Sequence, residues 1–302
     1  MPREGLGENS EFSTYHPIVN VVYFILTVGI TMFSLSPLFL AATYVMAWVY
    51  SVLLKGKEAV KLNLIFTVAS LVIMAVINTF FTHNGETVLF YINTNRITLE
   101  AFVYGIAAAI MLISVIIWFS CFNVIIRADK LIYLFGKVAP VLGLTLSMIF
   151  RFIPLLKSRF KEIRMGQQCM GRRSKDKNLI ARARQLVKEI SILIAWSLEA
   201  SIESADSMES RGYGLRGRTS FHLFKFAARD MLMLGIMGAL GTAVIIGCGA
   251  GKTSMYFYPK LVFHTPDAVT IIVLICYLIL LALPVIIDIT GEIKWKQLSL
   301  KD

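Results

Sequence analysis

Apolar residues along this chain are gathered in long blocks and do not alternate with polar residues as they would in half-buried strands. Six of these blocks have the length and apolarity of membrane-crossing helices. They are Ile18–Phe33, Pro37–Leu54, Leu62–Phe81, Leu99–Ile125, Met231–Ala250 and Ala268–Ile287. Only a short turn around Ser36 separates the first two, which predicts a helical hairpin. The pattern predicts an all-α membrane protein with about six transmembrane helices.

A seventh apolar run, Val138–Ile149, is shorter than most of the others. Basic residues flank it and prolines interrupt it, namely Lys137, Arg151, Pro140 and Pro154. With six spans the basic segments all fall on one side of the membrane, whereas a further span over Val138–Leu156 would divide them. Because basic loops stay in the cytoplasm, we expect an interfacial or packed helix here and cytoplasmic chain termini.

The region between the fourth and fifth spans has the periodicity of helices. Phe160, Ile163 and Gln167 continue one helix, and Leu179 to Met208 predicts a long amphipathic one. Its expected apolar side carries Ile180, Leu186, Val187, Ile190, Ile194, Ala195 and Leu198, and its charged residues, expected elsewhere on the surface, are Arg182, Arg184, Lys188, Glu189 and Glu203. Glycines should end this helix, at Gly212, Gly214 and Gly217.

These elements divide the chain into three expected parts. Residues 1–125 form an N-terminal membrane part with four spans, and residues 226–302 form a C-terminal membrane part with two. Between them, residues 126–225 form a helical region that is cytoplasmic or interfacial. Two loops, around residues 82–98 and 252–267, fall on the opposite side of the membrane.

Composition agrees with a membrane protein. Of 302 residues, 57% are hydrophobic and 16% charged, against about 25% charged in soluble domains. The charge is uneven, because Arg151 to Arg229 holds 17 Lys and Arg but 7 Asp and Glu, which is +10 of the total +11. Such a block favours cytoplasmic retention, contact with anionic membrane lipids or an acidic partner. No nucleic-acid partner is expected, since the block lacks a recognisable nucleic-acid motif.

Chemistry typical of enzymes and ion-coupled carriers is missing. The spans hold few ionisable residues, with Glu100 and Asp288 at their ends, although ion-coupled transporters need such groups inside the membrane. The four cysteines form no CxxC pair and the histidines are scattered, so no metal site is predicted. A phosphate-loop look-alike, Gly247–Thr253, has Ile246 where the motif requires glycine. We therefore expect no catalytic residue and no cofactor bound by this chain.

Two similar segments in the basic region each predict a helix end closed by glycine. One is Gly166-Gln167-Gln168-Cys169-Met170-Gly171, and the other is Ser207-Met208-Glu209-Ser210-Arg211-Gly212-Tyr213. A cation in the last turn also interacts favourably with the negative end of the helix dipole. An Arg-Gly pair is nevertheless an ordinary helix end. The residues around it are needed to distinguish a structural role from a functional one.

The second segment resembles the Ala-Met-Glu-Ala-Arg-Gly-Tyr signature of the transmembrane (T) component of energy-coupling factor (ECF) transporters. The first is similar to that family's other motif, Ala-Gln-x-Ala-Arg-Gly. Further matches follow in the family's order: His16-Pro17, Thr82–Gly85, Thr87–Tyr91, Ile97–Ala101 and Phe150–Pro154. The resemblance covers about residues 15 to 290.

The resemblance implies a subunit of an ABC-type uptake system for cobalt or a vitamin in a bacterial or archaeal plasma membrane. Two ATPase subunits that hold Mg-ATP would bind the helical coupling domain, and a separate small membrane protein, the S component, would bind the substrate. The implied ATPase-coupling residues are Ser210, Arg211 and Gly212 in one motif and Cys169, Met170 and Gly171 in the other, with auxiliary contacts from Arg172, Arg173 and Glu209. The chain itself would be non-catalytic.

Met170 departs from the family pattern, because it stands where the family has arginine. Either Arg172 or Arg173 supplies the charge, or that contact is apolar. Two other functions stay open: the permease of a conventional ABC transporter that lines its own substrate path, and a membrane enzyme with its active site in the loops. The sequence leaves the substrate open, since the S component would select it.

Overall fold

The computed structural model describes residues 10–82, 85–92, 95–171, 179–215, 224–251, 253, 255, 257 and 267–299. In these ranges the chain forms nine α-helices, one short 3-10 turn (η2, Glu11–Thr14) and one two-stranded hairpin. It divides into two compact units, residues 1–127 with 224–302 and residues 128–223. The predicted all-α fold is confirmed.

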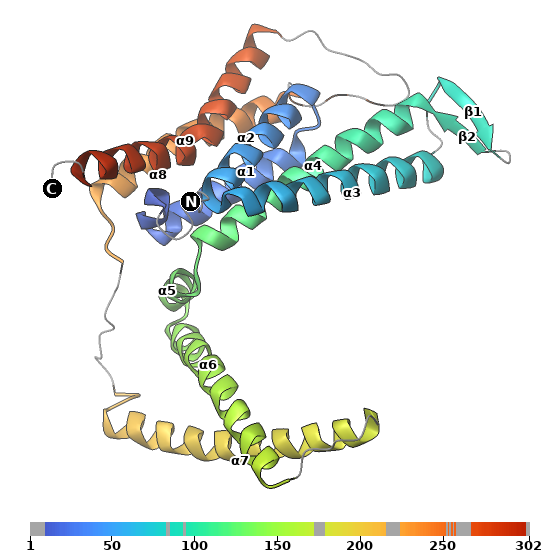
Figure 1. Ribbon diagram of the computed structural model, residues 1–302. Coiled ribbons are helices and arrows are strands. Elements are labelled where there is room, and N and C mark those ends of the chain that lie inside the picture. The colour runs from blue at the N-terminus through green and yellow to red at the C-terminus, as the bar shows by residue number, and fades with distance from the viewer. Residues whose placement is uncertain are drawn as a thin grey trace. The chain divides into compact units, whose positions relative to one another are not determined.

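The first unit is a bundle of six helices that lie side by side (Figure 1). They are α1 (Pro17–Phe33), α2 (Pro37–Lys55), α3 (Lys57–Phe81), α4 (Leu99–Ile125), α8 (Ala228–Gly249) and α9 (Ala268–Ser299). Helix α4 contacts α1, α2 and α3, while α9 packs on α2 and α8. Helices from the N-terminal and the C-terminal membrane parts thus pack into one body.

Polar contacts at one end of this bundle join the ends of two helices to each other and the starts of two others to each other. Lys55 at the end of α2 donates to Ser120 near the end of α4. The backbone N–H of His16, which precedes α1, donates to Asp230 in the first turn of α8 at 3.2 Å. The six helices therefore alternate in direction, and the chain leaves for the second unit and returns from it at this same end.

The core of the bundle is aromatic and contains hydroxyl groups with partners. Trp118 is fully buried between Tyr23, Phe24 and Tyr50, with ring centroids 5.9 to 6.2 Å away. The Tyr277 hydroxyl lies 2.7 Å from that of Thr43 and 3.1 Å from that of Thr31. The outer helix α3 instead leaves large apolar side chains exposed, among them Ile65, Phe66, Val72 and Phe80. Such a surface fits contact with lipid.

Six of the described helices are long and apolar enough to cross a membrane. The number agrees with the prediction, but the membership differs. Helix α6 (Pro140–Cys169) meets the criterion, whereas α1, expected as a span, has only 17 residues. The apolar run with Pro140 and Pro154 forms one helix, because α6 begins at Pro140 and continues through Pro154. A proline inside a helix removes one backbone hydrogen bond, and here the neighbouring turns are sufficient to keep the helix continuous.

The region expected as an outer loop contains an antiparallel hairpin, β1 (Val88–Ile92) with β2 (Asn95–Thr98). Thr98 caps the N-terminus of α4, and the buried Glu100 carboxylate accepts from the hydroxyl and the N–H of Thr87. The hairpin was missed because its strands are only five and four residues long. His83 and Asn84, part of the family resemblance, lie outside the described residues.

The second unit consists of α5 (Ala128–Val138), α6 and α7 (Leu179–Ser210). Helices α5 and α6 form a hairpin in which Gly136 and Gly143 let the two backbones approach closely. A Cβ atom on Gly143 would lie 2.4 Å from the Cα of Gly136. Helix α7 confirms the predicted long helix and extends it by two residues to Ser210.

Candidate functional site

Helix α6 ends at Cys169, and the next two residues turn the chain away. Met170 has φ −76° and ψ 9°, and its N–H donates to the carbonyl of Gly166 at 3.1 Å. Gly171 has φ +68°, and its N–H donates to the carbonyl of Gln168 at 3.0 Å. A glycine is needed here because other residues pay a steric cost at positive φ. The side chain of Met170 is 58% exposed, and Cys169 is an exposed free thiol.

Helix α7 ends in the same way. Gly212 has φ +76°, and its N–H donates to the carbonyl of Glu209 at 2.8 Å. The N–H of Tyr213 donates to the carbonyl of Met208 at 3.0 Å. These two bonds form a Schellman motif, in which Arg211 is the C-cap residue and Gly212 is C′. The predicted glycine stops at Gly212 and Gly214 are confirmed, while Gly217 lies outside the described residues.

Met170 and Arg211 therefore occupy equivalent positions, each directly before the glycine that ends its helix. We call the residues Cys169–Gly171 the first tip and Ser210–Gly212 the second tip. Arg211 is exposed and makes no hydrogen bond or ion pair within the part of the chain that the structure describes. Ser210 uses its hydroxyl locally, donating to the carbonyl of Ser207 at 2.9 Å. Both tips are thus available to a partner.

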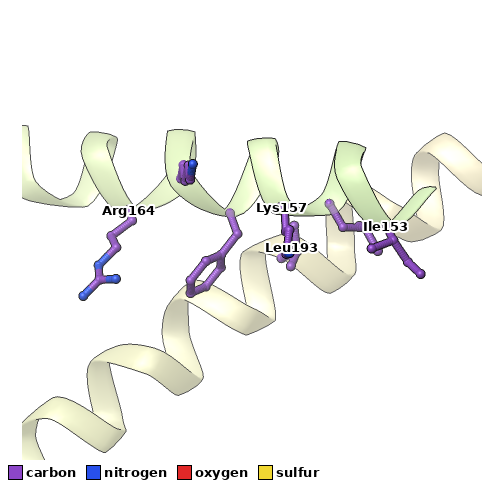
Figure 2. A pocket seen from close by; sticks show the side chains of 7 residues that line it. Ile153, Lys157, Arg164 and Leu193 are labelled. Atoms are coloured by element: carbon purple, nitrogen blue, oxygen red, sulfur yellow. The ribbon is translucent and has the colours of Figure 1, made fainter. Parts of the chain in front are cut away.

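The two helices that carry the tips cross each other. Figure 2 shows Ile153, Lys157 and Arg164 of α6 and Leu193 of α7, all of which line one open groove of about 610 Å³. Near the crossing, the guanidinium of Arg159 lies 5.0 Å from the ring centroid of Trp196 on α7, a cation–π contact. The crossing joins the two helices into one unit, so the tips are held on a common support.

The charges near the two tips have opposite signs. The second half of α6, from Arg151 to Gly171, carries five Lys and Arg and one Glu. The last turns of α7, from Glu199 to Ser210, carry four acids, Glu199, Glu203, Asp206 and Glu209, and no base. The first tip therefore follows a basic stretch, whereas Arg211 is a single cation that follows an acidic one.

Each tip also lies beside a groove. Next to the second tip, Met208, Glu209 and Tyr213 line a groove of about 530 Å³ together with Leu144 and Phe152 of α6. Glu209 lines this groove near Arg211, and its role as an auxiliary contact stays a prediction. The groove near the first tip measures about 410 Å³, and Arg164, Gln168, Arg182 and Glu189 are among the residues that line it. Arg172 and Arg173, the other expected auxiliary contacts, lie outside the described residues.

Glu189 was expected on the surface of α7, and this expectation is wrong. Its side chain is 1% exposed, and one carboxylate oxygen accepts from Gln185 at 2.9 Å, while the other has no hydrogen-bond partner among the described residues. Helical periodicity predicts on which side of α7 Glu189 lies. It does not predict which neighbouring residues cover that side. The expected apolar side of α7 stays largely uncovered, since Ile180, Val187 and Leu198 are all more than 60% exposed.

Within the described residues, no group of three or more His, Cys, Asp or Glu side chains could hold a metal ion. What the second unit offers is exposed apolar surface, two glycine-ended helix tips and charges of opposite sign. This arrangement fits binding to other proteins.

Comparison with known proteins gives a family. Residues 10–222 match the family CbiQ, described as cobalt transport protein. The chain is also 31% identical over 106 residues to the energy-coupling factor transporter transmembrane protein EcfT of Lactobacillus helveticus and 32% identical over 113 residues to EcfT of Streptococcus thermophilus. These matches cover 35% and 37% of this chain and 38% and 43% of the relatives.

A longer match, to EcfT of Streptococcus equi, is 28% identical over 177 residues and covers 54% of this chain and 64% of the relative. The chain thus spans about two fifths of the length of the first two curated relatives and less than two thirds of the third. Together with the six candidate spans, these relatives make the chain a multi-pass membrane protein. Because the family match extends over well more than half of the chain, the protein belongs to the cobalt transport protein (CbiQ) family.

Proposed function

We propose that this chain is the transmembrane scaffold and coupling (T) component of an ECF-type importer. In this proposal, two cytoplasmic ATPase subunits hold Mg-ATP and dock on the second unit. Their ATP-driven movement passes through α6 and α7 to a separate membrane S component, which binds a vitamin or metal micronutrient. Membership of the CbiQ family and the EcfT relatives support this assignment.

The observation that carries the proposal is the pair of equivalent helix tips. Two helices of one unit end in the same glycine geometry, and each presents its cap residue to solvent. Arg211 can make paired hydrogen bonds with a carboxylate in a partner's groove. Two equivalent tips suit two similar partner subunits, as a pair of ATPases would be.

The proposed role requires one orientation of the chain in the membrane. The second unit lies in the cytoplasm with the chain termini, and the hairpin β1–β2 lies on the opposite side of a bacterial or archaeal plasma membrane. Lipid covers the exposed apolar side of α3. The chain itself performs no catalysis and holds no cofactor, because ATP is hydrolysed in the partner subunits and the S component selects the substrate.

The test is co-purification of the tagged chain with the products of neighbouring genes, followed by uptake measurements in proteoliposomes. We expect two ATPases and one small, very hydrophobic membrane protein in the complex, and uptake that requires ATP. A complex of ATPases alone, with substrate bound by this chain, would instead identify a conventional ABC permease. Enzymatic activity of the chain without ATPases would identify a membrane enzyme and refute the proposal.

A further inference from the structure

The first unit contains a strap that fastens the returning chain to the membrane bundle. We define the strap as residues 10–16, which comprise Ser10, η2, Tyr15 and His16. One side of the strap is bound to α9 and the other to residues 226–230, where the chain re-enters the bundle after the second unit. These contacts join parts of the sequence that are more than 200 residues apart.

Asp288 on α9 holds the first side of the strap. Its carboxylate is 1% exposed and accepts from the Ser10 hydroxyl and from the N–H of Phe12, both at 2.8 Å. Phe12 is fully buried, with its ring 5.3 Å from that of Tyr23. The exposed Trp295 adds a bond from its ring N–H to Glu11 at 2.9 Å. The strap is therefore anchored in the bundle by polar and apolar contacts.

Asp230 in the first turn of α8 holds the other side. One oxygen of this buried carboxylate accepts from the N–H of His16 at 3.2 Å, and the other accepts from the N–H of Ala227 at 2.9 Å. The same carboxylate thus binds the strap and the segment that leads into α8. The ring of His16 also packs edge-on against Phe226, with centroids 5.0 Å apart.

Arg229 adds a second connection. Its guanidinium donates to the carbonyl of Thr14 at 3.2 Å and lies 5.0 Å from the centroid of the Tyr15 ring. Direct contacts with the strap therefore come from residues 226, 229 and 230. The N–H of Ala227 binds the same Asp230 carboxylate that binds the strap. Where the chain leaves the bundle, Ile126, the residue that directly follows α4, is also buried, with 5% of its surface exposed.

We propose that the strap is a positioning device that makes the re-entry point of the chain a fixed joint, so that displacement of the second tip is passed to α8 and the bundle. This inference rests on the proposed coupling function. Without the joint, residues 224–230 would shift while the bundle stayed in place. ATP hydrolysis would then continue with little transport, and Asp230 and the His16 N–H would be the residues that prevent this.

His16 offers a matched pair of variants. Its φ of −56° and the extended conformation of Tyr15 before it already suit proline at this position. His16→Pro removes the N–H that binds Asp230 and places a ring carbon in its position. Both His16→Pro and His16→Ala lose the imidazole, which contacts Phe226 and accepts from the N–H of Ile18, so the difference between the two variants isolates the His16 N–H. Asp230→Ala removes both bonds of the carboxylate, and Asp230→Asn keeps one acceptor oxygen. Lys296→Gln, which breaks an exposed ion pair with Glu292 on α9, is the control.

The experiment uses the complete complex in proteoliposomes and measures ATP hydrolysis and uptake on the same preparation. The probe is radiolabelled Co²⁺ or riboflavin, whichever the wild-type complex transports. We expect His16→Pro and Asp230→Ala to lower the uptake per ATP about fivefold, with hydrolysis within about twofold of wild type. Lys296→Gln should keep the wild-type ratio, His16→Ala should lower it much less than His16→Pro does, and Asp230→Asn should be intermediate.

Equal ratios for His16→Pro and His16→Ala would overturn the inference. A parallel loss of hydrolysis and uptake, or loss of the ATPases from the purified His16→Pro complex, would do the same, because the strap would then only maintain the fold. Failure of the proposed function looks different, since the wild-type chain itself would then bind no ATPases or transport nothing.

Discussion

The ends of α6 and α7 have the same backbone and opposite electrostatic surroundings. Met170 and Arg211 are both cap residues before a glycine with positive φ. Five basic residues and one acid occupy the last half of α6, whereas four acids precede Arg211. Glycine therefore determines the shape of each tip, and the preceding turns determine what the tip can bind.

The positive charge is therefore located on different residues at the two tips. At the second tip the cation is one residue, Arg211, and nearby Glu209 and Asp206 make a purely acidic partner surface unfavourable around it. At the first tip the positive charge belongs to the body of the helix, through residues such as Lys161 and Arg164, and Met170 can be apolar without making the tip neutral. We therefore expect the second tip to depend on one side chain and the first on several.

Both tips should face the same compartment, and cysteine labelling from each side of the membrane tests this directly. We expect native Cys169 and an engineered Ser210→Cys to react with a membrane-impermeant maleimide only from the cytoplasmic side. Asn84→Cys should react only from the other side, and Lys177→Cys should behave like the tips. Cys248 and Cys276 are replaced by alanine in every variant, and the exposed Cys169 is replaced as well in Ser210→Cys, Asn84→Cys and Lys177→Cys. Labelling of the two tips from opposite sides would refute a common docking surface.

Charge reversal at the second tip should have the largest effect on transport. Arg211→Glu adds an acid to a stretch that already has four and removes the only cation of the tip. Because a charge-assisted hydrogen bond contributes about 1.5–3 kcal/mol, we expect uptake to fall by roughly tenfold or more, or the ATPases to be lost from the complex. Arg184→Glu, at an exposed position elsewhere on α7, is the matched control. Unchanged uptake and unchanged ATPase binding would exclude Arg211 as an anchor.

Gly171 and Gly212 should both be sensitive to replacement by a β-branched residue. Gly212→Val forces a β-branched residue to positive φ at a cost of roughly 1–2 kcal/mol, and its Cβ would lie 3.0 Å from Leu215. We expect about a fivefold loss of uptake, and much less for Gly212→Asn, because asparagine tolerates this conformation. A Cβ added at Gly171 has no atom of the described residues within 4 Å, so Gly171→Val should have the smaller effect. Equal losses at both sites would show that the tips dock alike in spite of their charges.

Much of this architecture follows from the sequence because it is local. Apolar length predicts α2, α3, α4, α8 and α9, and glycine placement predicts where α6 and α7 end. Helix α6 also shows the limit of local signals. Prolines interrupt its apolar run, yet α6 begins at Pro140 and continues through Pro154, because one missing hydrogen bond does not outweigh the turns on both sides.

The features that sequence reasoning missed depend on distant partners. Asp230 and His16 are 214 residues apart, so only the folded bundle reveals that one carboxylate binds both the strap and α8. Glu189 is charged and lies on an amphipathic helix, so its pattern predicts exposure, while the structure buries it near α6. The positions of the two tips were predictable from the glycines. The contrast between their acidic and basic surroundings can be compared only because both helices end with the same backbone geometry.

The smallest expected effect is at Met170. Met170→Arg restores the arginine of the related motif at an exposed position that already follows a basic helix. If the partner's groove is acidic, the new guanidinium pairs there, and uptake should stay within about twofold of wild type. An apolar groove would instead bury an unpaired charge at a cost of several kcal/mol, and uptake would be lost.

The acidic groove is the expected one, because five basic residues on α6 already require a partner surface that tolerates positive charge. ATP-dependent uptake of Met170→Arg is compared with that of Met170→Ala and Arg172→Ala, which separate the apolar side chain from the neighbouring charge. We expect Arg172→Ala to lower uptake more than Met170→Ala does, since the charge and not the thioether would make the contact. If Met170→Arg is as inactive as Arg211→Glu while Arg172→Ala behaves like wild type, the first groove is apolar. The two partner subunits would then have diverged to fit two chemically different tips.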